Sequence, residues 1–375
     1  MSLHNEFYKN FGRIICHAWC EYDNEMVMCL SDKNAICKID KTTKDTELLG
    51  CYPNTEMGKE DLSASMLKID DRVVFCPFSS DYIGIYNIKM NKMDYIEISK
   101  PLVKKGVNYS PDAKFYNLYA YDGYVYLFGW TYPAIIEIDI DTYKLRYIDN
   151  WIEEIEKHEG FNSSNSYFNE GSVLIDNTVY LPMGCINGLF AFNLRDRSGR
   201  ILDIENGDTG YWGLVKYENF LWLSGINGNI FKFDLNKKVI EKIEIPEIEK
   251  YKAPIICEDR LLFYSENSKN IYFLNMDNRR WEAELDLNSL VDRGNHIVAI
   301  SYSDGLLKFA TQNTRSWYIY NLVTKCIEKT HYYLDDQEFV ETCWKSRCNE
   351  LNKTDSIFVE GKMGLDEFLS YIETL

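Results

Sequence analysis

Short runs in which apolar and polar residues alternate recur along the chain, and each is bounded by a tight-turn signal. The clearest case is Asn117–Gly129, where two apolar-rich runs flank Asp122 and Gly123. An Asp-Gly pair in this setting predicts a β-hairpin, because the turn needs positive φ angles that Gly adopts at little cost. Comparable turns begin at Asp23, Asp70, Asp176, Glu218, Glu258 and Asp304. The chain therefore contains seven copies of one hairpin unit, spaced 40 to 54 residues apart.

Each turn continues into a strand with one well-buried face. The third residue after the acidic turn position is always Met, Val or Leu, and an apolar residue follows two positions later, as expected of a strand. A third, apolar strand ends in Asp or Asn in six of the seven copies, and these residues start turns by bonding their own backbone. A more polar fourth strand follows. The pattern predicts an all-β protein, a seven-bladed β-propeller of four-stranded antiparallel blades.

The third, fifth and sixth copies resemble blades of the kelch-like group of β-propellers. They share its order of strand, turn, strand and then an apolar strand ending in Asp or Asn. The Gly-Gly doublet of kelch repeats is reduced here to one Gly, at Gly129, Gly184 and Gly225, and the fourth-strand Trp occurs only as Trp281. This fold-level resemblance implies the seven-bladed ring. No functional residues carry over, because such propellers include adaptors, carbohydrate oxidases and lyases.

The end of the chain has a helical pattern instead. We expect the propeller to span residues 1–334 and a short α-helical C-terminal extension, packed on the propeller, to span residues 335–375. Asp335 with Glu338 forms a capping-box-like start, and apolar residues then recur at helical spacing. A second short helix is expected over Leu365–Thr374. These helices either cover outer strand edges of the ring, which we favour, or form a docking arm for a partner.

Two connecting features also carry predictions. The ring needs a closure, for which Phe7–Ile15 and the segment after Lys325 are the candidates. The acidic run that starts at Trp151 predicts a short amphipathic helix in a long loop, capped by Asn150 and ended near Gly160.

The composition limits the partners and the compartment. The formal net charge of -17 argues against nucleic acid and against an anionic membrane as partners, since both require a basic surface. No stretch approaches the roughly twenty apolar residues of a membrane helix. The N-terminus lacks a secretory-signal pattern, so the 11 cysteines are interpreted as reduced thiols. We expect a cytoplasmic protein with no metal and no other cofactor.

The strand order sorts the loops onto two faces of the ring. Turns joining the first to the second and the third to the fourth strand are short, whereas the other loops vary in length, and variable loops on a rigid scaffold tend to carry function. Five residues before each acidic turn position the residue is small or Asn, which indicates packing at a crowded axis. One residue earlier the set is chemically mixed: His17, Ala64, Tyr116, Glu170, Trp212, Lys252 and Val298.

The polar and aromatic members of this mixed set form the candidate ligand-binding site at the channel mouth. Glu170 and His17 can serve as acid and base, and Lys252 can hold an anionic group. Trp212 and Tyr116 can stack on a sugar or another ring. Alternatively, a polar rim is what any solvated channel mouth shows. Loops between second and third strands add further candidates on the same face: Trp130, Tyr132 and Arg315.

Two functions fit these observations. The first, which we favour because no catalytic motif is present, is a non-enzymatic intracellular binding or scaffold protein. Its variable-loop face would hold a protein or a carbohydrate. The second is an enzyme, a lyase, hydrolase or epimerase, acting on a carbohydrate or small metabolite at the channel mouth.

Overall fold

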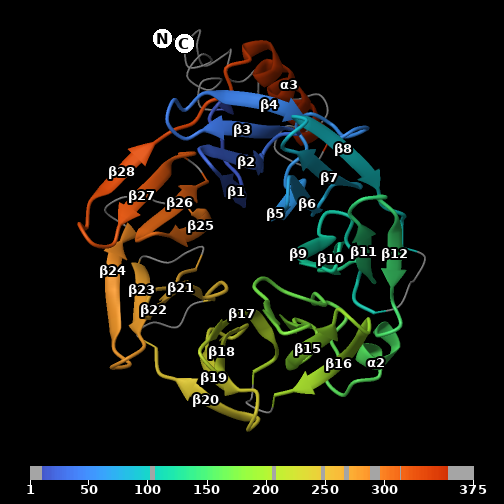
Figure 1. Cartoon of the computed structure of the whole chain (residues 1–375), viewed down its shortest axis with the longest axis vertical. Coiled ribbons are helices and arrows are strands. Elements are labelled where there is room, and N and C mark those ends of the chain that lie inside the picture. The colour runs from blue at the N-terminus through green and yellow to red at the C-terminus, as the bar shows by residue number, and fades with distance from the viewer. Residues whose placement is uncertain are drawn as a thin grey trace.

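The computed structural model describes residues 11–101, 106–204, 208–245, 250–265, 270–287, 296–312 and 314–353. Within these ranges the chain forms seven four-stranded antiparallel sheets, arranged as the blades of a ring (Figure 1). Each blade consists of four strands that are consecutive in the sequence. The predicted all-β class and the predicted seven-bladed β-propeller are therefore confirmed.

The strands occupy equivalent positions in the seven blades. The innermost strands are β1 (Trp19–Tyr22), β5 (Ser63–Ile69), β9 (Phe115–Tyr121), β13 (Val173–Ile175), β17 (Tyr211–Tyr217), β21 (Ile255–Cys257) and β25 (Ile297–Ser303). The second strands are β2 (Glu25–Cys29), β6 (Arg72–Pro77), β10 (Tyr124–Gly129), β14 (Thr178–Pro182), β18 (Phe220–Gly225), β22 (Arg260–Phe263) and β26 (Leu306–Thr311). The third strands are β3 (Ile36–Asp40), β7 (Tyr82–Asn87), β11 (Ile135–Asp139), β15 (Gly188–Asn193), β19 (Ile230–Asp234), β23 (Asn270–Asn275) and β27 (Trp317–Asn321). The outermost strands are β4 (Thr46–Gly50), β8 (Lys92–Glu97), β12 (Leu145–Ile148), β16 (Ser198–Asp203), β20 (Val239–Ile243), β24 (Trp281–Asp286) and β28 (Ile327–Thr330).

The turns that identified the repeats are present in every blade. The acidic residue at each of the seven predicted positions has a φ between 46° and 56°. Five of the seven are Asp, which tolerates this left-handed conformation better than most residues with a side chain, because its short polar group bonds locally. The turn signal therefore marked the true hairpin tips.

The end of the third strand needs one correction. In the second blade this strand ends at Asn87, not at Lys89 as the spacing predicted. Asn87 Oδ1 accepts a hydrogen bond from the backbone N–H of Met90 at 2.9 Å. The Asp or Asn that ends the third strand of each other blade accepts the same bond from three residues on. All seven blades thus use this turn.

The core lies between neighbouring blades, as the second strand of the third blade shows. Along β10, Val125 and Leu127 pack against the second blade, whereas Tyr126 and Phe128 pack against the fourth. The ring of Phe128 meets that of Phe192 at 5.7 Å, edge to face. Both faces of the strand are buried, so period-two alternation distributes apolar side chains between two interfaces. Each blade is thereby held by its two neighbours.

The ring is closed by the two segments proposed for this role, acting together. The backbone N–H of Ile14 donates to Tyr332 at 2.9 Å, and that of Leu334 donates to Gly12 at 2.9 Å. The indole of Trp317 donates to the Ile14 carbonyl at 2.9 Å. Within the described residues the first blade keeps its own four strands, so this closure joins the two terminal segments and exchanges no strand between blades.

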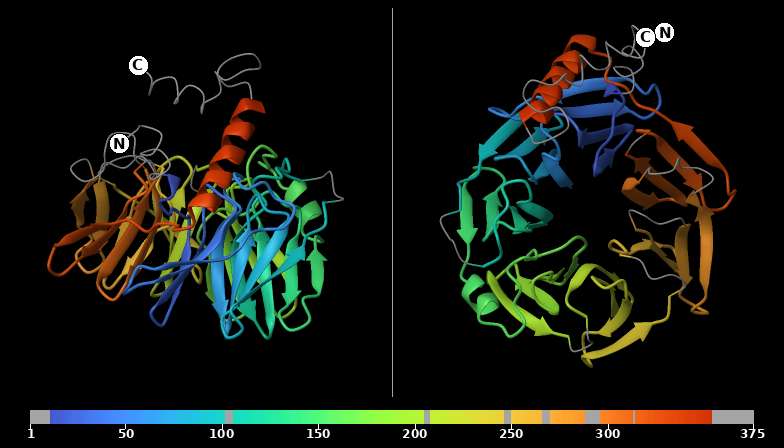
Figure 2. Two further views of the ribbon diagram at one scale, coloured as in Figure 1. Left: turned by 90° about the horizontal axis from the view of Figure 1, so that it is seen from above. Right: turned by 180° about the vertical axis from the view of Figure 1, so that it is seen from behind.

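The helix α3 (Gln337–Lys353) stands against the first blade and rises from one face of the ring (Figure 2). Val340, Cys343 and Trp344 are buried in one cluster with residues of the first blade. Its first turn is capped by Asp336, which accepts from the backbone N–H of Phe339 at 2.9 Å, rather than by the predicted Asp335. The predicted second helix lies outside the described residues. The division of the chain at residues 334 and 335 stays a prediction.

The loop helix α2 (Ile152–Glu156) is present where the acidic run predicted it. Its N-cap is Trp151, which makes no side-chain capping bond, so the prediction of an Asn150 cap was wrong. Instead, Ile152 and Ile155 hold it by burial between the third and fourth blades. None of the helices in the described ranges is long and apolar enough to cross a lipid bilayer.

Candidate functional site

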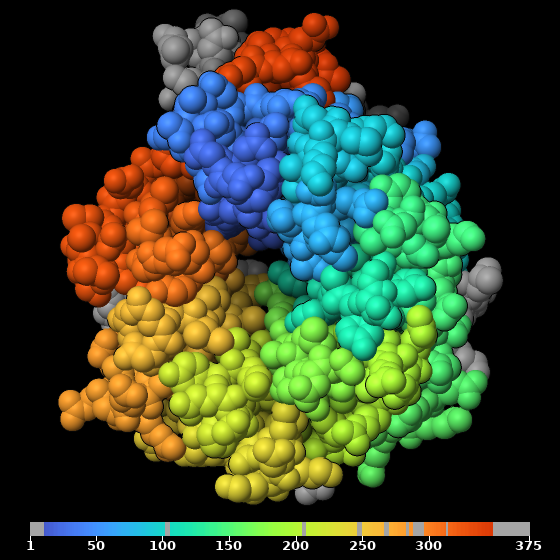
Figure 3. Space-filling view, viewed as in Figure 1, coloured from blue at the N-terminus to red at the C-terminus, as the bar shows by residue number. Residues whose placement is uncertain are grey.

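The blades surround a central opening (Figure 3). A cavity of about 520 Å³ lies at its mouth. Four of the five predicted mouth residues line it: His17, Tyr116, Glu170 and Lys252. These four come from four different blades, as the comparison of equivalent positions in the seven repeats predicted. The fifth, Trp212, lies beside them, with the ammonium of Lys252 5.8 Å from the centre of its ring.

A narrow axis brings these side chains together. Gly171 and Gly213 both lie against Ala253, and a Cβ atom built on either would come within 2.5 Å of an Ala253 atom. Real Cβ atoms do not approach this closely, so larger residues here would force the inner strands apart. The small residues that the sequence predicted five positions before each turn therefore allow neighbouring blades to pack closely at the axis. In six of the seven blades the residue directly before this position lines the mouth cavity.

β-bulges aim several of the mouth residues. On β9 the pairing with β10 passes from Asn117 directly to Phe115 and skips Tyr116. The same shift skips Trp212 on β17, and it also leaves out Ala64 on β5 and Val298 on β25. A bulged residue leaves the regular ladder, which re-aims its side chain and is common beside functional sites. In the other three blades the mouth residue lies just ahead of the strand.

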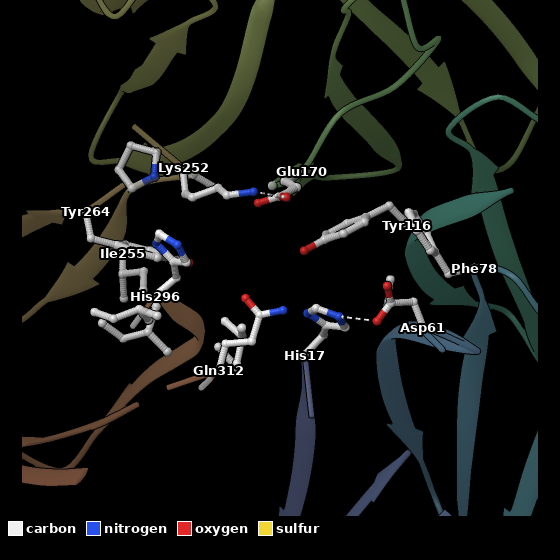
Figure 4. A pocket seen from close by; sticks show the side chains of 18 of the residues that line it. His17, Asp61, Phe78, Tyr116, Glu170, Lys252, Ile255, Tyr264, His296 and Gln312 are labelled. Carbon is white, nitrogen blue, oxygen red and sulfur yellow. Dashed lines mark hydrogen bonds and ion pairs between the residues drawn. The ribbon is translucent and has the colours of Figure 1, made fainter. Parts of the chain in front are cut away.

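Two pairs of side chains, each made of one basic and one acidic residue, face each other across the cavity (Figure 4). Lys252 Nζ lies 2.7 Å from Glu170 Oε1, and the two side chains are 21% and 11% exposed. His17 Nε2 lies 2.7 Å from Asp61 Oδ1. Figure 4 shows the Tyr116 hydroxyl pointing into the space between Glu170 and His17. The site thus presents hydrogen-bond donors and acceptors from opposite walls.

Burial and the neighbouring carboxylates set the protonation of this site. Burial alone would lower the pKa of His17, but the hydrogen bond and the charge of Asp61 outweigh it, and the pKa is raised. Burial and the nearby Glu170 carboxylate raise the pKa of Tyr116 well above its usual value. Tyr116 therefore keeps its proton at neutral pH and can donate it in a hydrogen bond, and His17 carries a positive charge over a wider pH range than a free histidine.

An aromatic wall forms one side of the cavity. Trp130 lies at the centre of this wall, with its ring 5.1 Å from Tyr116, 5.5 Å from Phe78 and 6.5 Å from Trp212. The contacts with Tyr116 and Phe78 are edge to face, which is a favoured arrangement of aromatic rings. The prediction that Trp130 lies on this face agrees with its place in the cavity wall.

Two of the predicted loop residues have other surroundings. Tyr132 is buried against Phe115, with ring centroids 4.7 Å apart, and its hydroxyl donates to Ser99 O at 2.7 Å. It is a core residue and presents no surface to a ligand, contrary to prediction. Arg315 pairs with Asp32 at 2.7 Å, so the guanidinium helps to hold the ring closure. It borders a smaller hollow of about 330 Å³ that shares His17 and Asp61 with the main cavity.

Several cavity residues were missed by the sequence reasoning. Three of them, like Trp130, directly follow the second strand of a blade: Phe78, Tyr264 and Gln312. A fourth, Asp61, lies in the loop between the first and second blades. A second column, counted one residue past the second strand, would have found Phe78, Tyr264 and Gln312. Asp61 belongs to a connection of irregular conformation, and no spacing rule predicts it. His296, next to the start of β25, also lines the cavity.

The described ranges contain no group of three or more His, Cys, Asp or Glu side chains placed to hold a metal ion. In particular, Cys16 is fully buried and its pKa is raised well above its usual value by burial, which disfavours the thiolate that a metal would need. Each of the ten cysteines whose side chains the structure describes is a free thiol.

No protein-family model matches the chain, and no curated protein matches it in sequence. Solved structures do resemble it. A streptogramin B lyase is similar with a TM-score of 0.59 and 12% identity, over 86% of this chain and 95% of that one. A chain of a mitotic checkpoint complex is similar with a TM-score of 0.56 and 8% identity, over 80% and 85%.

An extracellular domain of a two-component system protein from B. thetaiotaomicron is also similar. Its TM-score is 0.58 at 12% identity, over 82% of this chain but only 38% of that one. At such low identities these likenesses show the propeller fold and carry no information about the ligand.

Proposed function

We propose that the cavity at the channel mouth binds a small, uncharged, hydroxyl-rich molecule such as a carbohydrate. The observation that carries this proposal is the convergence of His17, Tyr116, Glu170 and Lys252 from four blades on one concavity beside the Trp130 wall. Concave sites of a few hundred cubic ångströms that combine aromatic surface with a few polar groups are the usual form of small-molecule sites. The cavity volume of about 520 Å³ falls in this range.

The charges in the cavity favour an uncharged ligand. Lys252 already has the carboxylate of Glu170 as its partner, and His17 has that of Asp61. An anionic ligand would compete with these carboxylates for the same cations, and the chain as a whole carries a formal charge of -17. Hydroxyl groups, which both donate and accept, can bond to either member of each pair. Aromatic rings such as Trp130 can stack on the apolar face of a sugar.

The compartment, the propeller subclass and an alternative partner also belong to this proposal. We place the protein in the cytosol, in keeping with its free thiols. We retain the kelch-like subclass from the turn and strand pattern. A protein partner on the same variable-loop face is the alternative occupant, and one structural neighbour belongs to a mitotic checkpoint complex.

A second candidate function is proton-transfer catalysis on such a molecule, by a lyase or an epimerase. The specific observation is the His17–Asp61 pair opposite the protonated Tyr116, since a histidine oriented by a carboxylate is a common general base. Above its raised pKa, neutral His17 can accept a proton from a substrate while Tyr116 donates a hydrogen bond. One structural neighbour is a lyase by name, streptogramin B lyase.

A thermal-shift screen with neutral mono- and disaccharides, sugar nucleotides and divalent metal salts tests the binding proposal, because a ligand that binds only the native state raises Tm. We expect neutral sugars to raise Tm. Trp130→Ala should then weaken binding roughly fivefold in calorimetry, since stacking contributes about 1 kcal/mol. Glu170→Gln should weaken it as well. The matched control is Glu241→Gln, on the outer strand β20 and 49% exposed. Sugars that leave Tm unchanged while a sugar nucleotide or metal raises it would contradict the proposal, as would full affinity in Trp130→Ala.

A further inference from the structure

The connection between the first and second blades links the helix α3 to the cavity. It runs from the end of β4 to the start of β5 and carries Asp61, the partner of His17. Its final part is anchored to both blades: Asp61 N donates to Ser31 O at 2.8 Å, and Ser79 N donates to Asp61 O at 3.0 Å. Asp61 has a φ of 53°, in the left-handed region that few residues with a side chain adopt. Such conformations persist only where the surroundings impose them.

The middle of this connection is held by α3. Gly58 N donates to Ser346 Oγ at 3.1 Å, and Glu60 Oε1 lies 2.6 Å from Arg347 Nη2. The approach is so close that a Cβ on Gly58 would lie 2.5 Å from the backbone nitrogen of Arg347. The helix therefore contacts the residue directly before Asp61, and one peptide unit separates the ion pair with α3 from the ion pair with His17.

The space beside this segment allows it to shift. Glu60, Asp61 and His17 line the smaller hollow of about 330 Å³, which lies against the same segment. A tightly packed chain cannot move without opening voids, whereas a segment that borders a hollow can. The contacts with α3 are thus the restraint on Glu60 from outside the ring.

We propose that α3 positions the His17–Asp61 pair, with Arg347 and Ser346 as positioning residues, so that a movement of α3 that breaks these two contacts changes the cavity. When Arg347 and Ser346 engage the connection, Asp61 is held against His17. When they release it, Asp61 turns toward the hollow and the cavity loses one of its two charged pairs. Because binding energies are reciprocal, a ligand that bonds to His17 and Asp61 also strengthens the docking of α3.

The charges around His17 allow this link to be measured directly. The carboxylates that act on His17 are Asp61, from the connection, and Glu170, from the fourth blade. Other titratable groups line the same cavity: Tyr116, Lys252, Tyr264 and His296. Three other charged groups line the smaller hollow beside His17: Asp32, Glu60 and Arg315. Asp61 is the group on this segment that pairs with His17, whereas Glu60 on the same segment pairs with Arg347. Ser346→Ala removes no charge, so a change in the pKa of His17 in that variant reports on the position of Asp61.

The test is an NMR titration of the His17 imidazole in the full-length protein, with the signal assigned by its loss in His17→Gln. We expect Arg347→Ala to lower the pKa of His17 by roughly half a pH unit, part of the contribution that a charge at ion-pair distance makes. Ser346→Ala should lower it in the same direction, and Arg347→Lys should restore most of it. The matched control is Lys345→Ala on the same helix, a side chain that is 63% exposed and pairs with Glu341.

An unchanged pKa of His17 in Arg347→Ala and in Ser346→Ala would overturn the proposal, as would an equal change in Lys345→Ala. Circular dichroism shows whether each variant keeps the propeller, and Ser346→Ala, the milder change, decides the matter if Arg347→Ala unfolds. The measurement needs no ligand. It therefore stands or falls separately from the proposal that the cavity binds a carbohydrate.

Discussion

The Glu170–Lys252 pair provides the sharpest quantitative prediction about the site. Lys252→Met keeps the length of the side chain and removes its charge, which leaves the Glu170 carboxylate, 11% exposed, without this cation. At the observed 2.7 Å and an effective dielectric constant of about 20, the two charges attract by about 6 kcal/mol. Most of this offsets the cost of burying them. Breaking a fully buried pair costs about 3–5 kcal/mol, and for this partly exposed pair we expect about 2.5 kcal/mol.

The double-mutant cycle separates the pair from its surroundings. We expect Glu170→Gln to cost about 1 kcal/mol, because the long Lys252 side chain can turn toward water, and the double variant to cost about 1 kcal/mol as well, because no buried charge is left unpaired. The coupling energy is then about 2.5 kcal/mol. Over 375 residues the unfolding entropy is about 0.8 kcal/mol per degree, so Lys252→Met should lower Tm by about 3 °C.

The assay is thermal unfolding followed by circular dichroism, at low and at high salt, for the wild type, both single variants and the double variant. Both side chains of the pair are mostly buried, so salt screens their attraction only weakly and the cycle should give a similar coupling in both conditions. Strictly additive changes in Tm would refute the reasoning, because they would show that the two charges do not depend on each other.

Two further predictions concern His17 and the ring closure. Since the pKa of His17 is raised in the folded protein, its pair with Asp61 stabilises the fold fully below the unfolded pKa of about 6.5, and this contribution is lost as the pH rises through the folded pKa. Asp61→Asn should therefore lower Tm more at about pH 5.5 than at about pH 8.5, and an equal effect at both pH values would contradict the raised pKa. Deletion of residues 1–13 removes Phe11, which packs against Trp344 with ring centroids 5.2 Å apart, and also removes the backbone bond from Leu334 to Gly12. Together these contribute about 4 kcal/mol, so Tm should fall by about 5 °C, and an unchanged Tm would rule out this closure.

Most of the fold could be predicted because its determinants are local. A hairpin turn depends on a few adjacent residues, such as Asp122 and Gly123, whose φ values of 50° and 78° match the turn signal. The strands on either side can be predicted from a period of two in the sequence, because successive side chains point to opposite faces of a strand. Because these local signals occur seven times, they predicted a seven-bladed β-propeller. Where the spacing failed, at Asn87 against Lys89, the error was two residues in one blade.

The candidate site was predictable only in the part that follows the repeat. Counting back from each turn placed His17, Tyr116, Glu170 and Lys252 at one mouth, since equivalent positions of a ring converge on its axis. The assignment of the loops between second and third strands to one face placed Tyr132 on the surface, although it is 2% exposed, because the direction of a loop side chain depends on its neighbours. Trp130, two residues away, faces the cavity.

The sequence by itself determined the blades, their number and the column of residues that meet at the channel mouth. The tertiary structure alone decided which of these side chains act together. The bulges at Tyr116 and Trp212 arise where the register between neighbouring strands shifts. His17 and Asp61, which pair, are 44 residues apart in the sequence. A local pattern carries no record of such contacts, because they depend on distances that exist only after the ring has closed.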